Sequence, residues 1–253
     1  MTTGILTDTV TLTGRSLRHV TRSLDTIITT AVMPIAIMLL FVFVFGGAMR
    51  TGDAAPVDYM LPGILLITIG SGVAYTSYRL FLDLQGGIFE RFQSMPIAPS
   101  AALWAHVLTS LAANAVSLVL VVAVGVLMGF RSGAGVGAWL AVAGILVLYT
   151  LVLTWIAVLA GLSAKTVDGA SAFSYPLIFL PFISSAFVPT DTMPGPVEWF
   201  AEYQPVTPIV NTIRDLLAQR PVSGDIWIAL AWCCGILVVA YVFAMLAYRR
   251  RLG

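Results

Sequence analysis

The sequence predicts an all-α polytopic membrane protein with six transmembrane helices, because of its composition and its long uncharged runs. Apolar residues make up 59% of the 253 residues and charged residues 10%, whereas a soluble domain carries about 25% charged residues. At a mean hydropathy of +0.96, a soluble fold of this size would have too little interior to cover its apolar side chains. We therefore expect a single membrane domain over residues 1–253, with the lipid bilayer as its solvent.

Charge and cysteine content exclude several kinds of partner and site. The chain carries 13 Lys and Arg against 12 Asp and Glu, so we expect no nucleic-acid partner. Its two cysteines, Cys233 and Cys234, are adjacent within an apolar run, where packing is a better interpretation than a disulfide or a metal site. No nucleophile elbow or HExxH motif is present. We therefore expect no catalytic residues and no metal ligands.

Residues 11–24 form the first predicted element, an amphipathic interfacial helix. At about 100° per residue, Arg15, Arg18 and Arg22 fall on one face and apolar side chains on the other, which is typical of a helix lying on an anionic membrane surface. The alternative is a solvated helix packed on a soluble domain, but the chain has little soluble domain. The apolar run that follows is long and has no A-x-A site, so we interpret it as an anchor rather than a signal peptide.

Six apolar runs are each long enough to cross the hydrocarbon core. The predicted spans are residues 27–45, 60–78, 103–130, 138–162, 170–188 and 226–248. Pro34 should kink the first span or mark its entry turn, and Pro176 and Pro181 should bend or break the fifth. Because a broken helix must have its freed carbonyls buried in protein or in a wet cavity, we expect the fifth span inside the bundle. Gly125 and Gly129 have the spacing of a close helix contact.

The stretch 84–100, between the second and third spans, reads LQGGIFERFQSMPIAPS. It opens with a glycine pair, carries a glutamate and an arginine between two phenylalanines, and closes with Pro96 and Pro99. This pattern predicts a short helix with a proline stop.

The long loop 189–225, between the fifth and sixth spans, predicts a helical hairpin of two short helices at about 196–203 and 209–218. Aromatic side chains in the first helix suit the membrane–water boundary. The second helix would present one apolar face, made of Ile209, Ile213, Leu216 and Leu217.

The distribution of positive charge predicts the orientation. With six spans, nine of the 13 Lys and Arg lie on the side of the two termini and four on the other side. The positive-inside rule then places both termini in the cytoplasm, in a multi-pass protein of the plasma (inner) membrane. The stretch 84–100 would lie in the cytoplasm, and the hairpin would be extracellular or re-entrant.

Four patches of the sequence carry a resemblance to a known family. They are YMLPGI at 59–64, ERFQSMPIAP at 90–99, GFR at 129–131, and FVPTDTMP at 187–194 followed by Trp199 and QPVT at 204–207. In their order and spacing they resemble the permease subunits of type-2 ABC exporters, most closely the drug-resistance branch of the daunorubicin-exporter kind. The resemblance covers nearly the whole chain.

The resemblance implies that the stretch 84–100 is a cytoplasmic coupling helix that docks in a groove of an ATPase subunit. The alternative is a solvated loop with its aromatic side chains on the bilayer. The coupling residues would be Gly86 and Gly87 as the hinge, followed by Phe89, Glu90, Arg91, Phe92 and Gln93.

ATP hydrolysis is not expected on this chain itself. A P-loop needs GxxxxGK[ST], and the only lysine, Lys165, lies in GLSAKT, where Ala164 replaces the second glycine and the spacing is wrong. We therefore expect no bound cofactor here. ATP and Mg²⁺ would bind a separate ATPase subunit, and a second copy or a sister permease would complete the pathway.

The predicted function is that of a transport subunit for a hydrophobic or amphipathic substrate such as a drug, an antibiotic or a lipid. An ion-coupled secondary transporter is one alternative, but no predicted span interior carries a charged residue and no inverted repeat is visible. An intramembrane enzyme or scaffold, and an ABC exporter of polysaccharide or lipid-linked envelope material, are the others. The candidate pathway residues are Thr68, Ser71, Tyr75, Asn114, Phe173, Tyr175, Phe179 and Phe182. For each of them, hydrogen bonding within the protein or ordinary packing is the competing interpretation.

Overall fold

The computed structural model describes residues 24–47, 55–86 and 99–252, and every regular element in these ranges is a helix. Four of these helices are long and apolar enough to cross a membrane: α3 (Pro56–Gln85), α5 (Pro99–Leu127), α6 (Val136–Ser163) and α11 (Asp225–Leu252). Two further apolar segments are shorter. One is α2 (Leu24–Leu39), which continues as the π-helix η1 (Leu40–Phe45), and the other lies between Val167 and Ile183. The predicted interfacial helix, residues 11–24, lies almost entirely outside the described residues.

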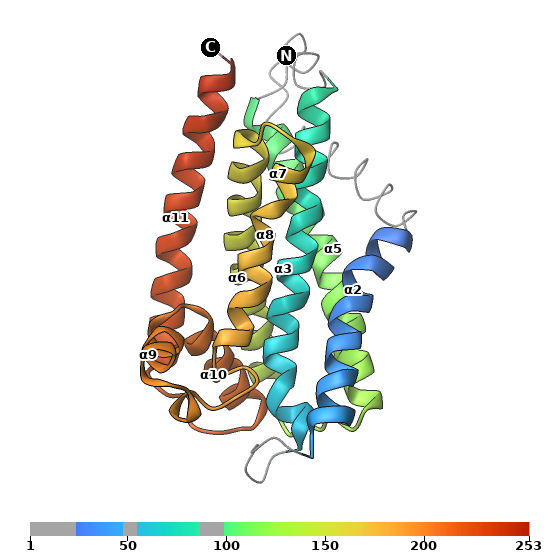
Figure 1. Cartoon of the computed structure of the whole chain (residues 1–253), viewed down its shortest axis with the longest axis vertical. Helices are drawn as coiled ribbons and strands as arrows, with labels where there is room; N and C mark the ends of the chain where they lie inside the picture. Colours follow the sequence, from blue (N-terminus) through green and yellow to red (C-terminus); the bar gives the residue numbers. More distant parts are fainter. Residues whose placement is uncertain (1–23, 48–54, 87–98, 253) are drawn as a thin grey trace.

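Helix α3 lies in the middle of the bundle, between α2 and α5 on one side and α6 and α8 on the other (Figure 1). All its side chains from Met60 to Gly70 are buried, whereas α5 and α11 leave most of their surface open. Helix α11 packs mainly on α6. Thr68, Thr76 and Ser77 of α3 are therefore buried within the protein, whereas Ser71, Tyr75 and Tyr78 are half-buried.

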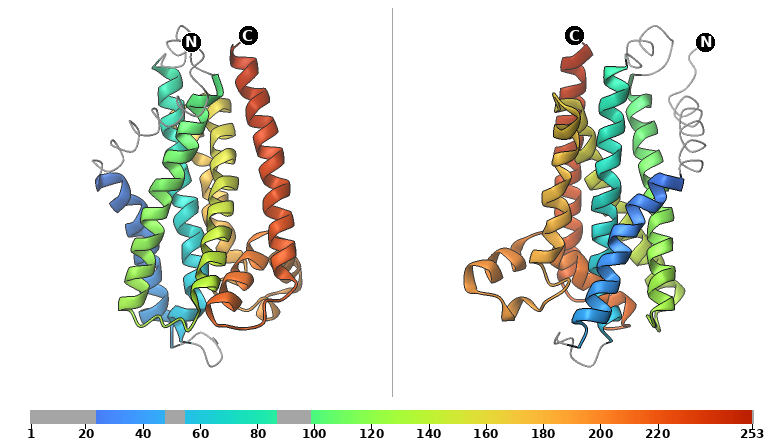
Figure 2. Two further views of the ribbon diagram at one scale, coloured as in Figure 1. Left: turned by 180° about the vertical axis from the view of Figure 1, so that it is seen from behind. Right: turned by 45° about the vertical axis from the view of Figure 1, so that its right-hand side comes forward.

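The long helices run between two ends of the bundle (Figures 1 and 2). One end, here called the hairpin end, holds η3 (Thr190–Thr192), α9 (Gly195–Tyr203), α10 (Val206–Leu217) and the first turn of α11. The opposite end holds the end of α3, the start of α5 and the end of α11. Helix α9 projects sideways from the bundle (Figure 2). Helix α10 packs against the end of the bundle and buries Ile209, Ile213 and Leu217. The predicted apolar face of α10 is therefore the face that packs.

Proline and glycine set several helix ends. Pro99 is the first residue of α5, which fits the fixed φ of proline at a helix start, and the short helix predicted before it lies outside the described residues. Gly129 ends α5 with φ +101°, and the Phe130 N–H donates to the Gly125 carbonyl at 2.9 Å. This is a Schellman cap. The close approach that the glycine spacing permits is therefore absent at Gly129, where a Cβ would meet nothing within 4 Å, but present at Gly125, which packs closely against Leu61.

The fifth apolar segment is broken, in agreement with its two prolines. It consists of α7 (Val167–Ala172), α8 (Ser174–Phe179) and the 3-10 helix η2 (Leu180–Ile183). Side chains satisfy the carbonyls freed by the last break. Gln204 Nε2 donates to the Ile183 carbonyl at 2.8 Å, and Ser184 Oγ donates to the Pro181 carbonyl at 2.6 Å. Pro34, by contrast, lies within α2, which continues on both sides of it, so Pro34 does not mark an entry turn.

The expected position of the fifth segment inside the bundle is only half right. One face packs on α3, where a Cβ at Gly70 would lie 3.3 Å from Ile178. The other face is open, because Tyr175 and Phe179 are each 61% exposed. Side chains can satisfy the freed carbonyls at the packed face, so the break does not require the whole segment to be enclosed.

Candidate functional site

Two of the candidate pathway residues on α3 donate hydrogen bonds from their hydroxyl groups to backbone carbonyls of the same helix. Thr68 is fully buried and donates to the Ile64 carbonyl at 2.8 Å, and Ser71 donates to the Ile67 carbonyl at 3.0 Å. The competing interpretation of these hydroxyls, hydrogen bonding within the protein, therefore describes both residues in this conformation.

A second group of polar side chains joins three helices in the middle of the bundle. We call Thr76 of α3, Ser110 and Asn114 of α5, and Thr154 of α6 the polar seam. The Ser110 hydroxyl lies 3.0 Å from that of Thr76 and 3.1 Å from that of Thr154. Asn114 is 2% exposed and donates to the Ser110 carbonyl at 2.9 Å. As expected from its polarity, Asn114 faces protein, and its amide lies against Gly72 of α3.

Aromatic candidate residues on the fifth apolar segment form a cluster with a phenylalanine of the first apolar segment. Phe182 stacks on Phe187 with ring centroids 5.0 Å apart, and Phe41 of η1 lies 4.7 Å from Phe187. Phe179 lies 6.1 Å from Phe182. Phe179 extends the cluster to the exposed face of α8, where Tyr175, one turn earlier, is equally exposed. The cluster is thus an aromatic wall, open on one side, between the first and fifth apolar segments.

The remaining two candidates lie apart from this wall. Phe173 joins α7 to α8 and packs, half-buried, against the main core. Tyr75 is half-buried on α3, where its ring lies 6.2 Å from that of Tyr78 and 5.8 Å from the guanidinium carbon of Arg79.

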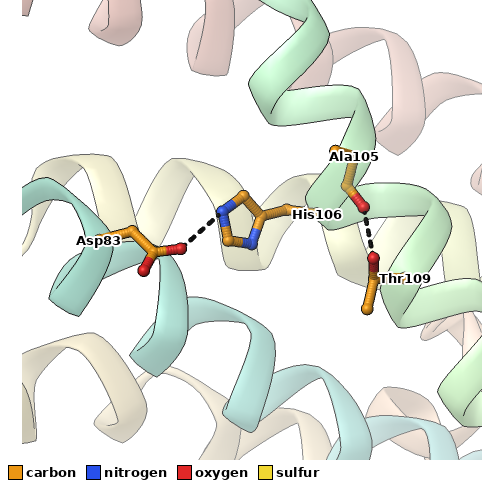
Figure 3. A network of polar contacts seen from close by, with 4 residues as sticks. All are labelled: Asp83, Ala105, His106 and Thr109. Atoms are coloured by element: carbon orange, nitrogen blue, oxygen red, sulfur yellow. Dashed lines mark hydrogen bonds and ion pairs between the residues drawn. The ribbon is translucent and has the colours of Figure 1, made fainter. Parts of the chain in front are cut away.

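An ion pair joins the two helices that flank the predicted coupling stretch. Asp83 near the end of α3 and Nε2 of His106 near the start of α5 are 3.2 Å apart, and Figure 3 shows the two side chains pointing toward each other. The pair is ionic when the imidazole is protonated. Gly86 ends α3, and its N–H donates to the Leu82 carbonyl. The predicted coupling residues Gly87, Phe89, Glu90, Arg91, Phe92 and Gln93, and the interfacial residues Arg15, Arg18 and Arg22, lie outside the described residues.

A further group of polar side chains lies at the hairpin end, around Arg214 of α10. Its guanidinium lies over the Tyr59 ring, 3.9 Å from the centroid, and donates from Nη2 to the Ser185 carbonyl at 2.7 Å. Nε and Nη2 also donate to the Tyr59 carbonyl, at 3.3 and 3.2 Å. A residue of α10 thereby fastens the start of α3 to the end of the broken fifth segment.

Asn211, one turn before Arg214, extends this network to α11. Its Oδ1 accepts from Nη1 of Arg214 at 3.1 Å and from Oγ of Ser185 at 2.7 Å, while its Nδ2 donates to the Asp225 carboxylate at 3.1 Å. We call Tyr59, Ser185, Asn211, Arg214 and Asp225 the hairpin cluster. It joins α3, the fifth segment, α10 and α11, whose positions would have to change if this end of the bundle opened.

A cavity of about 450 Å³ lies beside the hairpin cluster, between the first turn of α3, the loop after α5, α10 and the first turn of α11. Within the described part of the chain, Arg214 has no carboxylate at ion-pair distance. Burial lowers the pKa of its guanidinium and the nearby Arg220 adds to this, while Tyr59 and Asp215 oppose it. Arg214 is thus a largely buried cation that neutral acceptors hold.

Sequence reasoning did not single out the hairpin cluster. Arg214 was counted only as one of the four basic residues on the side away from the termini. Yet Asn211 and Arg214 stand three residues apart beside the apolar face of a predicted amphipathic helix. That spacing places them side by side on α10. It could not reveal the carbonyls of Tyr59 and Ser185, because these belong to distant parts of the chain.

Comparisons with known proteins agree with this architecture. The family model of the ABC-2 type transporter matches residues 7–218. A daunorubicin resistance ABC transporter permease of Streptomyces coeruleorubidus is 28% identical over 233 residues, which cover 89% of this chain and 80% of that protein. A probable doxorubicin resistance ABC transporter permease of Mycobacterium tuberculosis is 26% identical over 243 residues, 94% of this chain and 87% of that protein. The chain therefore belongs to the ABC-2 type transporter family and is the multi-pass membrane subunit of an ABC exporter, which works with an ABC ATPase.

Proposed function

We propose that this permease exports a hydrophobic or amphipathic drug-like molecule, and that two copies, or this chain and a sister permease, enclose its route. The similar proteins named for daunorubicin and doxorubicin resistance support the class of substrate. ATP and Mg²⁺ would bind the ATPase partner, and this chain would contribute the route and the mechanical coupling.

The proposed orientation has six spans and both termini in the cytoplasm. In this arrangement η1 completes the first span and α7, α8 and η2 together form the fifth. The hairpin end then faces outward, with Arg131, Arg214 and Arg220, while Arg79, Lys165 and the arginines that end α11 face the cytoplasm. The excess of positive charge on the cytoplasmic side of the whole sequence supports this choice.

The observation that carries the proposed route is the aromatic wall, open on one side. Tyr175 and Phe179 present aromatic faces and one hydroxyl outward from a broken helix. Such surfaces suit planar, amphipathic or cationic molecules through apolar and cation–π contacts. Thr68 and Asn114 are enclosed within this chain, so the residues that we propose to line the route are Tyr175, Phe179 and Phe182.

Drug efflux by the permease together with its ATPase tests this route. Phe179→Ala removes an exposed ring from the wall and should reduce doxorubicin efflux severalfold at unchanged permease abundance. Phe243→Ala removes a comparably exposed ring from α11 and is the matched control. Equal efflux by the two variants would contradict the proposed wall. Unchanged efflux after loss of the ATPase would contradict the proposed function as a whole.

Coupling is proposed to run through Phe89, Glu90, Arg91, Phe92 and Gln93, with Gly86 and Gly87 as the hinge. The Asp83–His106 pair supports this, because it holds together the two helices from which the stretch emerges. Glu90→Ala combined with Arg91→Ala should leave the permease folded and bound to the membrane but lower substrate-stimulated ATP hydrolysis. Full stimulation in this double variant would count against a coupling role.

A further inference from the structure

The cavity at the hairpin end is lined by equal numbers of positive and negative side chains. The six are Asp58, Asp215, Asp225, Arg131, Arg214 and Arg220. A ligand with a net charge would be attracted by half of them and repelled by the other half. A ligand that carries one positive and one negative group can satisfy both kinds. At about 450 Å³, the cavity has room for a group larger than a single ion.

The guanidinium of Arg214 favours a ligand with a negatively charged group. Its hydrogen bonds go to two carbonyls and one amide oxygen, none of which carries a charge. One of its two Nη1 hydrogens has no acceptor within the described residues. Arg131 and Arg220 line the same cavity with exposed side chains. Phosphate oxygens pair with guanidinium groups through short, charge-assisted bonds, so a phosphate fits this side of the cavity.

The carboxylates that line the cavity favour a ligand that also has a positively charged group. The Asp215 carboxylate has no hydrogen-bond partner within the described residues, although the backbone carbonyl of Asp215 accepts from the Arg220 N–H. Asp58 accepts only the Arg131 backbone N–H at 3.3 Å, and Asp225 accepts from Asn211 through one oxygen. A primary ammonium offers three N–H donors to such oxygens, whereas a quaternary ammonium offers none. An amine-bearing ligand is therefore favoured over a choline-bearing one.

The depth of the cavity indicates where such a ligand comes from. Trp227 of α11, two residues beyond Asp225, is 73% exposed, and Trp139 lies in the first turn of α6 at the same end of the bundle. Trp199 and Tyr203 on α9 are 65% and 64% exposed. Exposed Trp and Tyr collect at the level of the lipid headgroups. The cavity therefore lies where phospholipid headgroups are the most concentrated zwitterions.

We propose that the cavity at the hairpin end binds the headgroup of a zwitterionic aminophospholipid, with the phosphate on the arginines and the ammonium on the aspartates. This site is separate from the aromatic wall. The proposal depends on the hairpin end lying at a membrane surface but not on drug export. Binding can be measured on the purified permease without ATPase or drug, so failure of one proposal can be told apart from failure of the other.

Lipid binding by the full-length permease, delipidated in detergent, tests the site. Native mass spectrometry with added phosphatidylethanolamine should give saturable binding, weaker binding of phosphatidylcholine and the weakest of phosphatidylglycerol. Arg131→Gln combined with Arg220→Gln leaves every side-chain bond of Arg214 in place, so the protein should fold. The double variant should bind phosphatidylethanolamine about tenfold more weakly. Arg249→Gln combined with Arg250→Gln, at the opposite end, is the matched control and should bind as the wild type does.

Four outcomes would overturn the proposal. Equal affinities in the two double variants would show that the lipid binds elsewhere. Equal affinities for the three lipids would remove the role of the amine. Displacement of the lipid by millimolar inorganic phosphate, but not by the same concentration of chloride, would identify the ligand as free phosphate rather than a lipid. Asp215→Asn should reduce the preference for phosphatidylethanolamine over phosphatidylcholine, and an unchanged preference would likewise exclude the aspartates.

Discussion

The polar seam and the hairpin cluster both bury polar side chains where helices meet, yet they use opposite chemistry. The seam consists of hydroxyls and one amide, each of which can act without a charge. The hairpin cluster is built around a guanidinium that donates to carbonyls from two distant segments. Both join three or more segments, so the difference does not lie in how many elements they hold together.

In the proposed orientation, depth in the bilayer would account for the difference. A charged side chain at the bilayer centre costs about 2.5–3.5 kcal/mol on the insertion scale, whereas the headgroup region tolerates it. Neutral interhelical hydrogen bonds in membrane proteins contribute about 0.6 kcal/mol on average. Hydrogen bonds to charged groups contribute about 1.5–3 kcal/mol. We infer that the hairpin cluster holds the helix ends strongly, while the seam mainly sets the register of α3, α5 and α6.

The largest expected effect is that of Arg214→Ala. The substitution leaves the carbonyls of half-buried Tyr59 and buried Ser185 without this donor. We expect the free energy of unfolding to fall by about 3 kcal/mol, measured as a lower thermal midpoint by tryptophan fluorescence in detergent.

Arg220→Ala is the matched control for that experiment. Arg220 lies just beyond the same helix, and its side chain is exposed. Its removal should change stability by no more than about 0.5 kcal/mol. If Arg214→Ala were equally mild, the hairpin cluster would not be the stronger of the two regions.

Two glycines give an intermediate test, one in each region. A Cβ at Gly63 would lie 2.5 Å from the Cβ of Ala186, which cannot rotate away. A Cβ at Gly72 would lie 2.2 Å from Oδ1 of Asn114. The Asn114 side chain can turn aside, which costs the hydrogen bond from its Nδ2 to the Ser110 carbonyl. We therefore expect Gly63→Ala to cost about 1–3 kcal/mol and Gly72→Ala about 1 kcal/mol.

The control for both glycines is Gly144→Ala in α6. A Cβ there would meet nothing within 4 Å, so the better helix propensity of alanine should leave stability unchanged or raise it slightly. The same unfolding measurement applies. A smaller loss for Gly63→Ala than for Gly72→Ala would reverse the ranking of the two regions.

Sequence reasoning reached the helices but not the partners of their polar groups. Long apolar runs predict a helix in lipid, because backbone groups there must bond within the segment. The prolines at 176 and 181 likewise predicted a broken fifth segment. The hydroxyl partners of Ser110 and the carbonyl partners of Arg214 lie on other elements, and no local pattern records which side chain faces which distant group. The spacing of Gly125 and Gly129 was ambiguous for a related reason, because it is the same whether Gly129 packs within a helix or caps its end.

The smallest expected effect comes from removing one bond of the seam. Thr154→Val takes away the hydroxyl that lies 3.1 Å from that of Ser110 on α5, whereas Thr150→Val takes away a hydroxyl that donates to the Leu146 carbonyl of its own helix. Both threonines lie on α6 and are at most 2% exposed, so the two substitutions remove the same atoms from similar surroundings. Their difference in unfolding free energy isolates the bond between helices.

We expect Thr154→Val to destabilise the protein by about 0.6 kcal/mol more than Thr150→Val. The difference should be small because Ser110 keeps its bond to Thr76 after the substitution, so no buried hydroxyl loses its last partner. Thermal unfolding of the two variants under identical conditions measures it. A difference above about 2 kcal/mol would mean that the seam holds the helices as firmly as the charged cluster does. Depth would then not decide how strongly this protein joins its helices.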